Sequence, residues 1–210
     1  MIIAGMTIFI GAGVYSYFSD VETTTANTFT TGTLDLKVGD ANPTTEQINI
    51  TELKPGDTGS AANWTLQNIG SITGDLNISV GAITNNENAR SDLEEATGDT
   101  TGGATEGELG ANLLVAFWMD VDRDNTWSTG DYYLASTGSK VSHSSGSTLP
   151  SAAYDVLNSY DSDEWANVET DFTGLIGYFK VEYELPAATT NVVQSDSSVF
   201  NITFTLMQHI

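Results

Sequence analysis

The chain has 210 residues, no cysteine, and 28 acidic against six basic residues, which gives a formal net charge of −22. This charge argues against binding to nucleic acids or anionic lipid headgroups, because both are bound through Lys and Arg. Without cysteine, neither disulfide bonds nor thiolate metal sites can hold the fold, so burial of apolar side chains has to stabilise it. The length allows one substantial core, and β-sandwiches of this size commonly form a single domain.

An apolar run without Lys or Arg extends from Met1 to Phe18. Its length suits the apolar core of an export signal and is marginal for the ~20 residues that a membrane span needs. Small residues at 11–13 and Ser16 favour cleavage after Ser16. Because no basic residue precedes the run, we expect residues 1–16 to be either a signal peptide or a retained apolar segment.

Apolar and polar residues alternate with period two in many segments beyond residue 31, as in strands with one buried face. Residues 113–119 are continuously apolar, which predicts a central strand buried on both faces. The strand segments are 34–38, 48–50, 64–66, 76–80, 113–119, 132–134, 181–185 and 200–206. We therefore expect an all-β fold, a single two-sheet jelly-roll-like β-sandwich with long surface loops over residues 31–210.

Two stretches between the expected strands are rich in turn-forming residues. Residues 92–110 are acidic and Gly-rich, and residues 136–151 are Ser-rich, so both are expected as surface loops. A short helix is expected over 152–158, where three apolar side chains would share one face.

The sharpest local motif runs from Asp120 to Asp131. Its carboxylates fall where a calcium loop of the EF-hand type places its ligands, although Asp replaces the final Glu. Asn125 stands where that loop has Gly, and Asn tolerates the left-handed conformation required there. Because the flanks read as strands, we expect the loop in a β-hairpin, with an ordinary solvated acidic turn as the alternative. The predicted calcium ligands are Asp120, Asp122, Asp124, the backbone carbonyl of Thr126, Ser128 (directly or through water) and Asp131.

Catalytic motifs are harder to find. The chain has two histidines, His143 and His209, and contains neither a His-Glu-x-x-His motif nor a Gly-x-Ser-x-Gly elbow. We therefore expect no enzymatic activity. Four Asn-x-Ser/Thr sequons are candidate glycosylation sites: Asn49, Asn63, Asn77 and Asn201.

Four short blocks occur in one order along the N-terminal part of the chain: Tyr17–Asp20, Asn27–Leu36, Leu53–Asp57 and Gln67–Ser71. In these blocks the chain resembles the TasA/camelysin family of exported bacterial and archaeal matrix and filament proteins. The resemblance implies a jelly-roll-like sandwich, secretion, and assembly into fibres or pili by strand donation. The camelysin branch has been classed with metallopeptidases, for which this chain lacks the usual motif.

We therefore expect a secreted, extracellular or cell-surface protein that serves as the structural subunit of a filament, pilus or biofilm matrix fibre. Its partner would be itself, in a homopolymer joined head to tail and stabilised by calcium. Residues 17–30 are the expected donor strand, with Tyr17, Phe18, Val21 and Phe29 as its apolar side chains. The alternative is a monomeric adhesion module, secreted or tethered to a membrane through an uncleaved N-terminus.

Overall fold

The computed structural model describes residues 32–40, 42, 48, 53–88 and 91–209. The expected signal segment, the expected donor strand with Tyr17, Phe18, Val21 and Phe29, and Asn49 lie outside these residues. The described part folds into antiparallel sheets, which confirms the all-β class and is consistent with a sandwich.

The larger sheet has the strand order β1-β2-β10-β5-β6-β7, with β8 beside β5. Alternating apolar residues explain most of its strands, and β2 and β10 pair along nearly their whole length. The bounds are β1 Leu36–Val38, β2 Thr58–Asn68, β5 Leu114–Asp120, β6 Tyr132–Ala135, β7 Ser139–Ser142, β8 Asp155–Val156 and β10 Gly174–Glu184.

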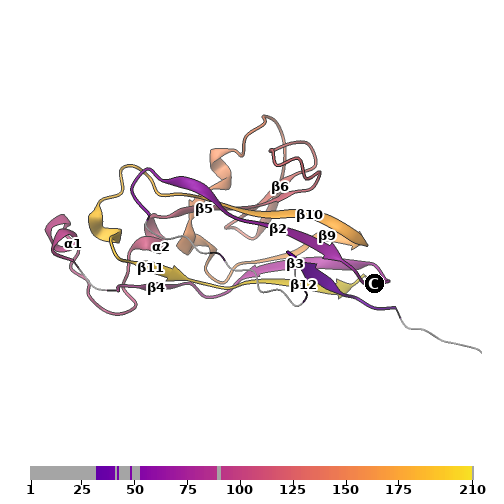
Figure 1. Cartoon of the computed structure of the whole chain (residues 1–210), viewed down its shortest axis with the longest axis horizontal. Helices are drawn as coiled ribbons and strands as arrows, with labels where there is room; N and C mark the ends of the chain where they lie inside the picture. The colour runs from indigo at the N-terminus through magenta and orange to yellow at the C-terminus, as the bar shows by residue number, and fades with distance from the viewer. Residues whose placement is uncertain (1–31, 41, 43–47, 49–52, 89–90, 210) are drawn as a thin grey trace, which may run out of the picture. The chain divides into compact units, whose positions relative to one another are not determined.

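The smaller sheet has the order β12-β3-β9. Strands β4 and β11 form a separate two-stranded sheet, in which β4 follows β3 along the chain and β11 precedes β12. Figure 1 shows this layer, with β3 and β12, beside the layer that holds β2, β5 and β10. The bounds are β3 Gly74–Val80, β4 Thr84–Asn86, β9 Glu164–Phe172, β11 Ser197–Val199 and β12 Ile202–Gln208.

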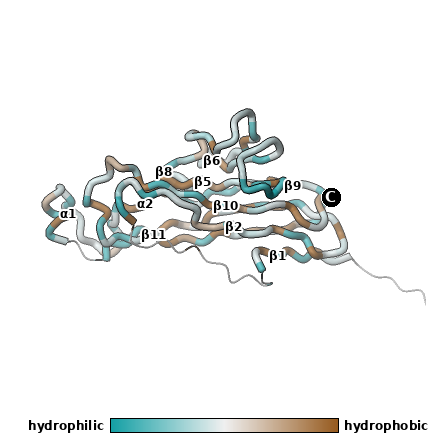
Figure 2. The backbone as a smooth tube through the Cα atoms, turned by 45° about the horizontal axis from the view of Figure 1, so that its top comes forward, coloured by the Kyte–Doolittle hydropathy of each residue, from teal (hydrophilic) through white to brown (hydrophobic). Residues whose placement is uncertain are grey.

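The main core lies between these two sheets. Phe117 of β5 stacks on Phe179 of β10, and Phe179 meets Phe204 of β12 edge to face, with ring centroids 5.0 Å apart. Figure 2 shows hydrophobic stretches along β2 and β5. Aromatic rings thus join the sheets where the alternating pattern places inward side chains.

Strand β5 is buried on both faces, as its continuous apolar sequence predicts. Phe117 and Met119 belong to the main core, whereas Ala116 and Trp118 belong to a second cluster on the opposite face. This second cluster places Trp118 under the loop that follows β5.

The acidic stretch 92–110 contains one helix and the start of a second, although it was expected as a loop. Helix α1 (Asp92–Thr97) starts with a capping box, in which Ser91 and Glu94 each bond the other's backbone N–H. Helix α2 (Leu109–Asn112) leads directly into β5. Both lie with β4 and β11 at the end of the sandwich away from the C-terminus (Figure 1).

The helix expected over 152–158 is wrong. The chain there forms the 3-10 helices η1 (Ser151–Ala153) and η2 (Leu157–Tyr160), separated by the short strand β8. Strand β8 pairs with the start of β5, so tertiary pairing overrides the local preference. A further 3-10 helix, η3 (Asn191–Val193), precedes β11. Among the described residues, no helix is long and apolar enough to cross a membrane.

Candidate metal centre

The hairpin of β5 and β6 carries the predicted calcium loop. The two strands pair antiparallel from Phe117↔Leu134 to Met119↔Tyr132. Asp120 ends β5 and Asp131 immediately precedes β6, and both side chains are fully buried. The hairpin therefore brings the two ends of the loop together, as expected for a calcium loop without flanking helices.

Backbone amides hold the two buried carboxylates. Asp131 accepts N–H bonds from Val121 at 2.8 Å and from Ser128 at 2.7 Å, one at each oxygen. Asp120 Oδ2 accepts the N–H of Asn125 at 2.9 Å. Asn125 has φ 65°, so it takes the left-handed conformation that the sequence motif requires at this position.

The structure brings together three of the six predicted ligand residues. Asp120, Asp122 and Asp131 each offer a carboxylate oxygen, and these oxygens lie within 4.8 Å of one another. Ser128 borders this group, since its hydroxyl donates to Asp122 Oδ2 at 2.8 Å. Three convergent carboxylates provide an all-oxygen ligand set of the kind that a hard divalent cation prefers.

Asp124 lies outside the convergent group. Its Oδ1 accepts hydrogen bonds from both the backbone N–H and the hydroxyl of Thr126, at 2.7 and 2.6 Å. These bonds lower the pKa of Asp124, because they stabilise its ionised form. Asp124 and Thr126 therefore form a local turn, and the predicted ligand at the fifth position is engaged elsewhere.

A buried lysine lies beside the loop. Lys180 of β10 places its Nζ 3.8 Å from Asp120 Oδ2, 3.1 Å from Asn125 Oδ1 and 4.8 Å from the centroid of the Trp118 ring. Burial raises the pKa of Asp120, while backbone hydrogen bonds and the Lys180 charge act in the opposite direction. Asp120 Oδ1 has no hydrogen-bond partner, so one oxygen of this buried carboxylate remains available to a cation.

Aromatic packing anchors the loop on the outer face of the larger sheet. Trp127 meets Trp118 edge to face at 5.9 Å and lies 6.2 Å from the Tyr133 ring. The His143 ring lies 5.3 Å from Trp127, and its Nε2 is 2.9 Å from the Gly146 carbonyl oxygen. The loop is thus held by packing as well as by hydrogen bonds.

The two histidines occupy separate structural settings. His143 packs on Trp127, whereas His209 places Nδ1 2.8 Å from a carboxylate oxygen of Asp75. Neither belongs to a group of potential metal ligands within the described residues.

The described sequons differ in accessibility. Asn63 and Asn201 are exposed, whereas Asn77 is half-buried and its Oδ1 accepts the backbone N–H of Asn167 at 2.8 Å. Asn63 donates to Asn125 Oδ1 at 3.3 Å. Exposure therefore makes Asn63 and Asn201 more accessible to glycosylation than Asn77.

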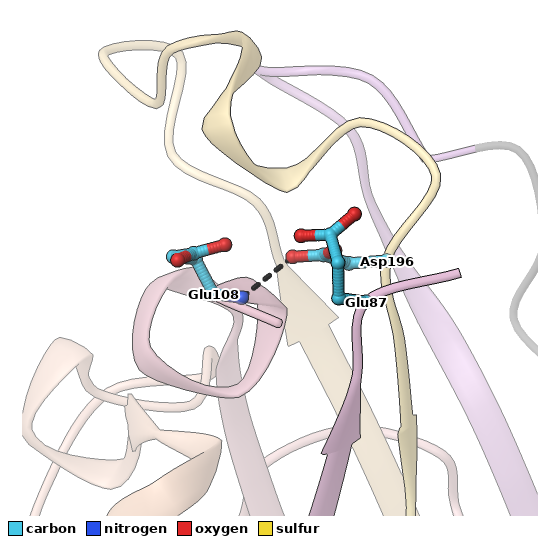
Figure 3. A group of neighbouring side chains, drawn as sticks. All are labelled: Glu87, Glu108 and Asp196. Carbon is cyan, nitrogen blue, oxygen red and sulfur yellow. Dashed lines mark hydrogen bonds between the residues drawn. The ribbon is translucent and has the colours of Figure 1, made fainter. Parts of the chain in front are cut away.

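A second acidic group, formed by Glu87, Glu108 and Asp196, was not predicted from the sequence (Figure 3). Glu108 and Asp196 are 88 positions apart, so no local spacing reveals that they meet. The one signal available in the sequence is the acidic character of residues 92–110, which says nothing about Glu87 or Asp196.

Comparison with known proteins places the chain in a family. A search of curated proteins finds no match. A family model described as camelysin metallo-endopeptidase matches residues 2–209, which is nearly the whole chain. The N-terminal blocks and the full-length match agree, and the chain therefore belongs to the camelysin family.

Proposed function

We propose that this protein is a structural subunit of an extracellular filament or matrix fibre, joined head to tail by strand donation. Membership of the TasA/camelysin family supports a secreted surface or biofilm-matrix protein in general. The observation that carries the finer proposal is the edge of the smaller sheet formed by β12.

Strand β12 is a regular edge strand. It pairs with β3 without a bulge from Ile202↔Val80 to Gln208↔Gly74, and no described strand pairs with its other side. Its inward side chains, Ile202, Phe204 and Leu206, are only half-buried. A long regular edge with incompletely covered apolar side chains is a template for pairing with another strand.

The opposite edge of the same sheet is protected. Strand β9 pairs with β3 through two register shifts, and Asn167 and Asp171 have positive φ. Strand β9 also contacts the larger sheet, because Lys140 of β7 donates to the Val168 carbonyl and Trp165 Nε1 donates to the Ala135 carbonyl. Irregularity and cross-sheet contacts disfavour edge pairing here, which supports β12 as the acceptor edge of this sheet.

The donor in this proposal is the segment 17–30 of a neighbouring subunit. Main-chain hydrogen bonds along β12 would provide affinity, and Phe18, Val21 and Phe29 would cover the half-buried side chains of β12. Donor and acceptor are different surfaces, so each join leaves a new donor and a new acceptor, and the assembly extends into a filament.

A peptide added in trans tests this assignment. We expect a synthetic peptide of residues 17–30 to bind a chain that begins at Gly32 and to slow hydrogen exchange of the β12 amides. The control peptide carries Ser in place of Phe18, Val21 and Phe29, and should not bind. The full chain should form filaments in electron micrographs, and deletion of residues 17–29 should leave folded monomers. Filaments that persist after the deletion would refute the donor assignment.

We also propose calcium as the ligand of the loop from Asp120 to Asp131. The all-oxygen group and the unpartnered Asp120 Oδ1 favour a hard cation. Isothermal titration with calcium tests this, and Asp122→Asn is the informative variant because Asp122 is exposed and its loss leaves the buried core intact.

The family's description gives a second candidate function, a metallo-endopeptidase. A catalytic zinc of that class takes histidine together with carboxylate ligands. Within the described residues, neither His143 nor His209 joins a ligand group, so these residues do not fit a catalytic zinc. Hydrolysis of an unfolded protein substrate that stops on metal chelation, and is lost in His143→Ala or His209→Ala, would establish the peptidase instead.

A further inference from the structure

Three carboxylates converge at the end of the sandwich that holds α1, α2 and the β4-β11 pair. Glu87 directly follows β4, Glu108 precedes α2, and Asp196 precedes β11. One carboxylate oxygen from each lies within 4.8 Å of the other two. Figure 3 shows the three side chains reaching the same place from separate segments.

Glu87 is the central observation. Its side chain is buried, with the residue only 8% exposed, and neither of its carboxylate oxygens has a hydrogen-bond partner. Buried carboxylates normally have all their oxygens engaged, because an unpartnered buried oxygen is costly. Glu108 Oε2 and Asp196 Oδ1 are also buried without a hydrogen-bond partner.

The other oxygens of Glu108 and Asp196 hold these side chains in place. Asp196 Oδ2 accepts backbone N–H bonds from Glu108 at 2.6 Å and from Leu109 at 3.1 Å. Glu108 Oε1 accepts the hydroxyl of Thr101 at 2.7 Å. Each side chain is therefore oriented by one oxygen and leaves the other oxygen for a further ligand.

The surroundings add negative charge. Burial raises the pKa of Glu87, and the charges of Asp196, Glu94, Asp99 and Glu108 raise it further. The ion pairs found among the described residues include none of Glu87, Glu108 and Asp196. Unlike the loop after β5, this group has no described lysine beside it to offset its charge.

We propose that Glu87, Glu108 and Asp196 form a second cation site, which binds calcium. The ligand atoms are all carboxylate oxygens, which suit a hard cation and disfavour zinc or copper. Four unpartnered oxygens from three residues would supply part of the flexible coordination shell of calcium, which water molecules would complete. The site does not depend on filament assembly, since all three ligands come from one chain.

The bound calcium would reinforce three segments that already meet through the β4-β11 pairing and the hydrogen bonds of Asp196. Ser195 donates to Glu94 Oε1 at 3.3 Å, and Asn88 donates to the Ser195 carbonyl oxygen at 2.6 Å. A cation beside Glu87 and Asp196 would strengthen this junction and hold α1 and α2 on the β4-β11 pair. Calcium would then order the acidic stretch that the sequence marks as a loop.

Calcium stoichiometry of the full chain tests the proposal. Flow dialysis with radioactive calcium should show that Glu87→Gln lowers the number of bound ions by one per chain, whatever the loop after β5 contributes. The matched control is Glu95→Gln, an exposed position on α1 with the same change of charge, which should leave the stoichiometry unchanged. Circular dichroism checks that both variants fold.

Hydrogen exchange places the lost ion. In wild type, calcium should slow the amides of α1, α2 and residues 195–199, and Glu87→Gln should abolish that slowing while leaving the amides of residues 120–131 unchanged. Unchanged stoichiometry in Glu87→Gln would overturn the proposal, as would calcium-independent exchange in these segments. A site that prefers magnesium at equal concentration would overturn the assignment to calcium.

Discussion

The two acidic sites lie toward opposite ends of β5, and their buried carboxylates are stabilised in different ways. In the loop from Asp120 to Asp131, the chain supplies backbone N–H donors and the ammonium group of Lys180. Around Glu87, it leaves four buried carboxylate oxygens without partners. Carboxylates that are close in sequence can accept hydrogen bonds from the backbone of their own loop. Carboxylates from distant segments depend on donors or cations that tertiary contacts place beside them.

This contrast predicts different roles for a cation. The loop has enough internal partners to keep its conformation without calcium, so calcium there adds stability to a formed structure. The Glu87 group has like charges in a buried setting, so its metal-free state is expected to be strained or locally open.

Chelation should give the largest effect and would test whether both sites bind. At a calcium concentration 100-fold above the dissociation constant, one site contributes about 2.7 kcal/mol to the free energy of unfolding, so two sites contribute about 5 kcal/mol. Denaturant unfolding with and without chelator measures this difference. Asp122→Asn and Glu87→Gln should each remove about half of it, and their effects should add, because the sites lie toward opposite ends of β5 and share no ligand. A non-additive result would mean that the two sites act as one.

Replacing Lys180 with Met tests the internal cation of the loop. Removal of one partner of a buried charge pair costs about 3–5 kcal/mol, so the chelated protein should lose roughly that stability. Calcium should restore part of it, because the ion takes over the neutralisation of Asp120. Lys54→Met is the control, since Lys54 is exposed and its change should cost no more than about 0.5 kcal/mol. Equal losses in the two variants would contradict the role assigned to Lys180.

Asp131 tests whether the loop depends on its backbone bonds. Asp131→Ala leaves the N–H groups of Val121 and Ser128 without their acceptor and should cost about 3 kcal/mol even in chelator. Asp131→Asn retains one acceptor oxygen and should cost less. By contrast, Glu87→Gln in chelator should be neutral or stabilising, because it removes a buried like charge. If Glu87→Gln lowers the unfolding free energy in chelator, the proposed difference between the two sites would be contradicted.

The smallest effect is expected at Asp124. Its Oδ1 accepts hydrogen bonds from Thr126 within the same exposed turn, so Asp124→Asn should change the unfolding free energy by no more than about 0.5 kcal/mol. It should also leave calcium affinity nearly unchanged, as measured by titration. A tenfold loss of affinity would show that Asp124 turns inward when calcium binds.

The sequence pattern predicted much of the fold, and it marked one of the two acidic groups that the structure shows. Alternation located β3 and β12, and the continuous apolar run identified β5 as buried on both faces. The motif from Asp120 to Asp131 was recognisable because its spacing is local. It could not show that Asp124 turns toward Thr126 or that Lys180 approaches Asp120, because Lys180 arrives from another strand.

By itself, the sequence determined the all-β class, the family and the hairpin loop, since periodicity and local spacing are properties of contiguous residues. The tertiary structure decided which edge of the smaller sheet stays regular, where Lys180 lies, and that Glu87, Glu108 and Asp196 meet. It also replaced the helix expected over 152–158 with strand β8, because pairing with β5 outweighs a local helical preference. Contacts between distant segments depend on how the two sheets pack, and that packing is not encoded in any single stretch of the chain.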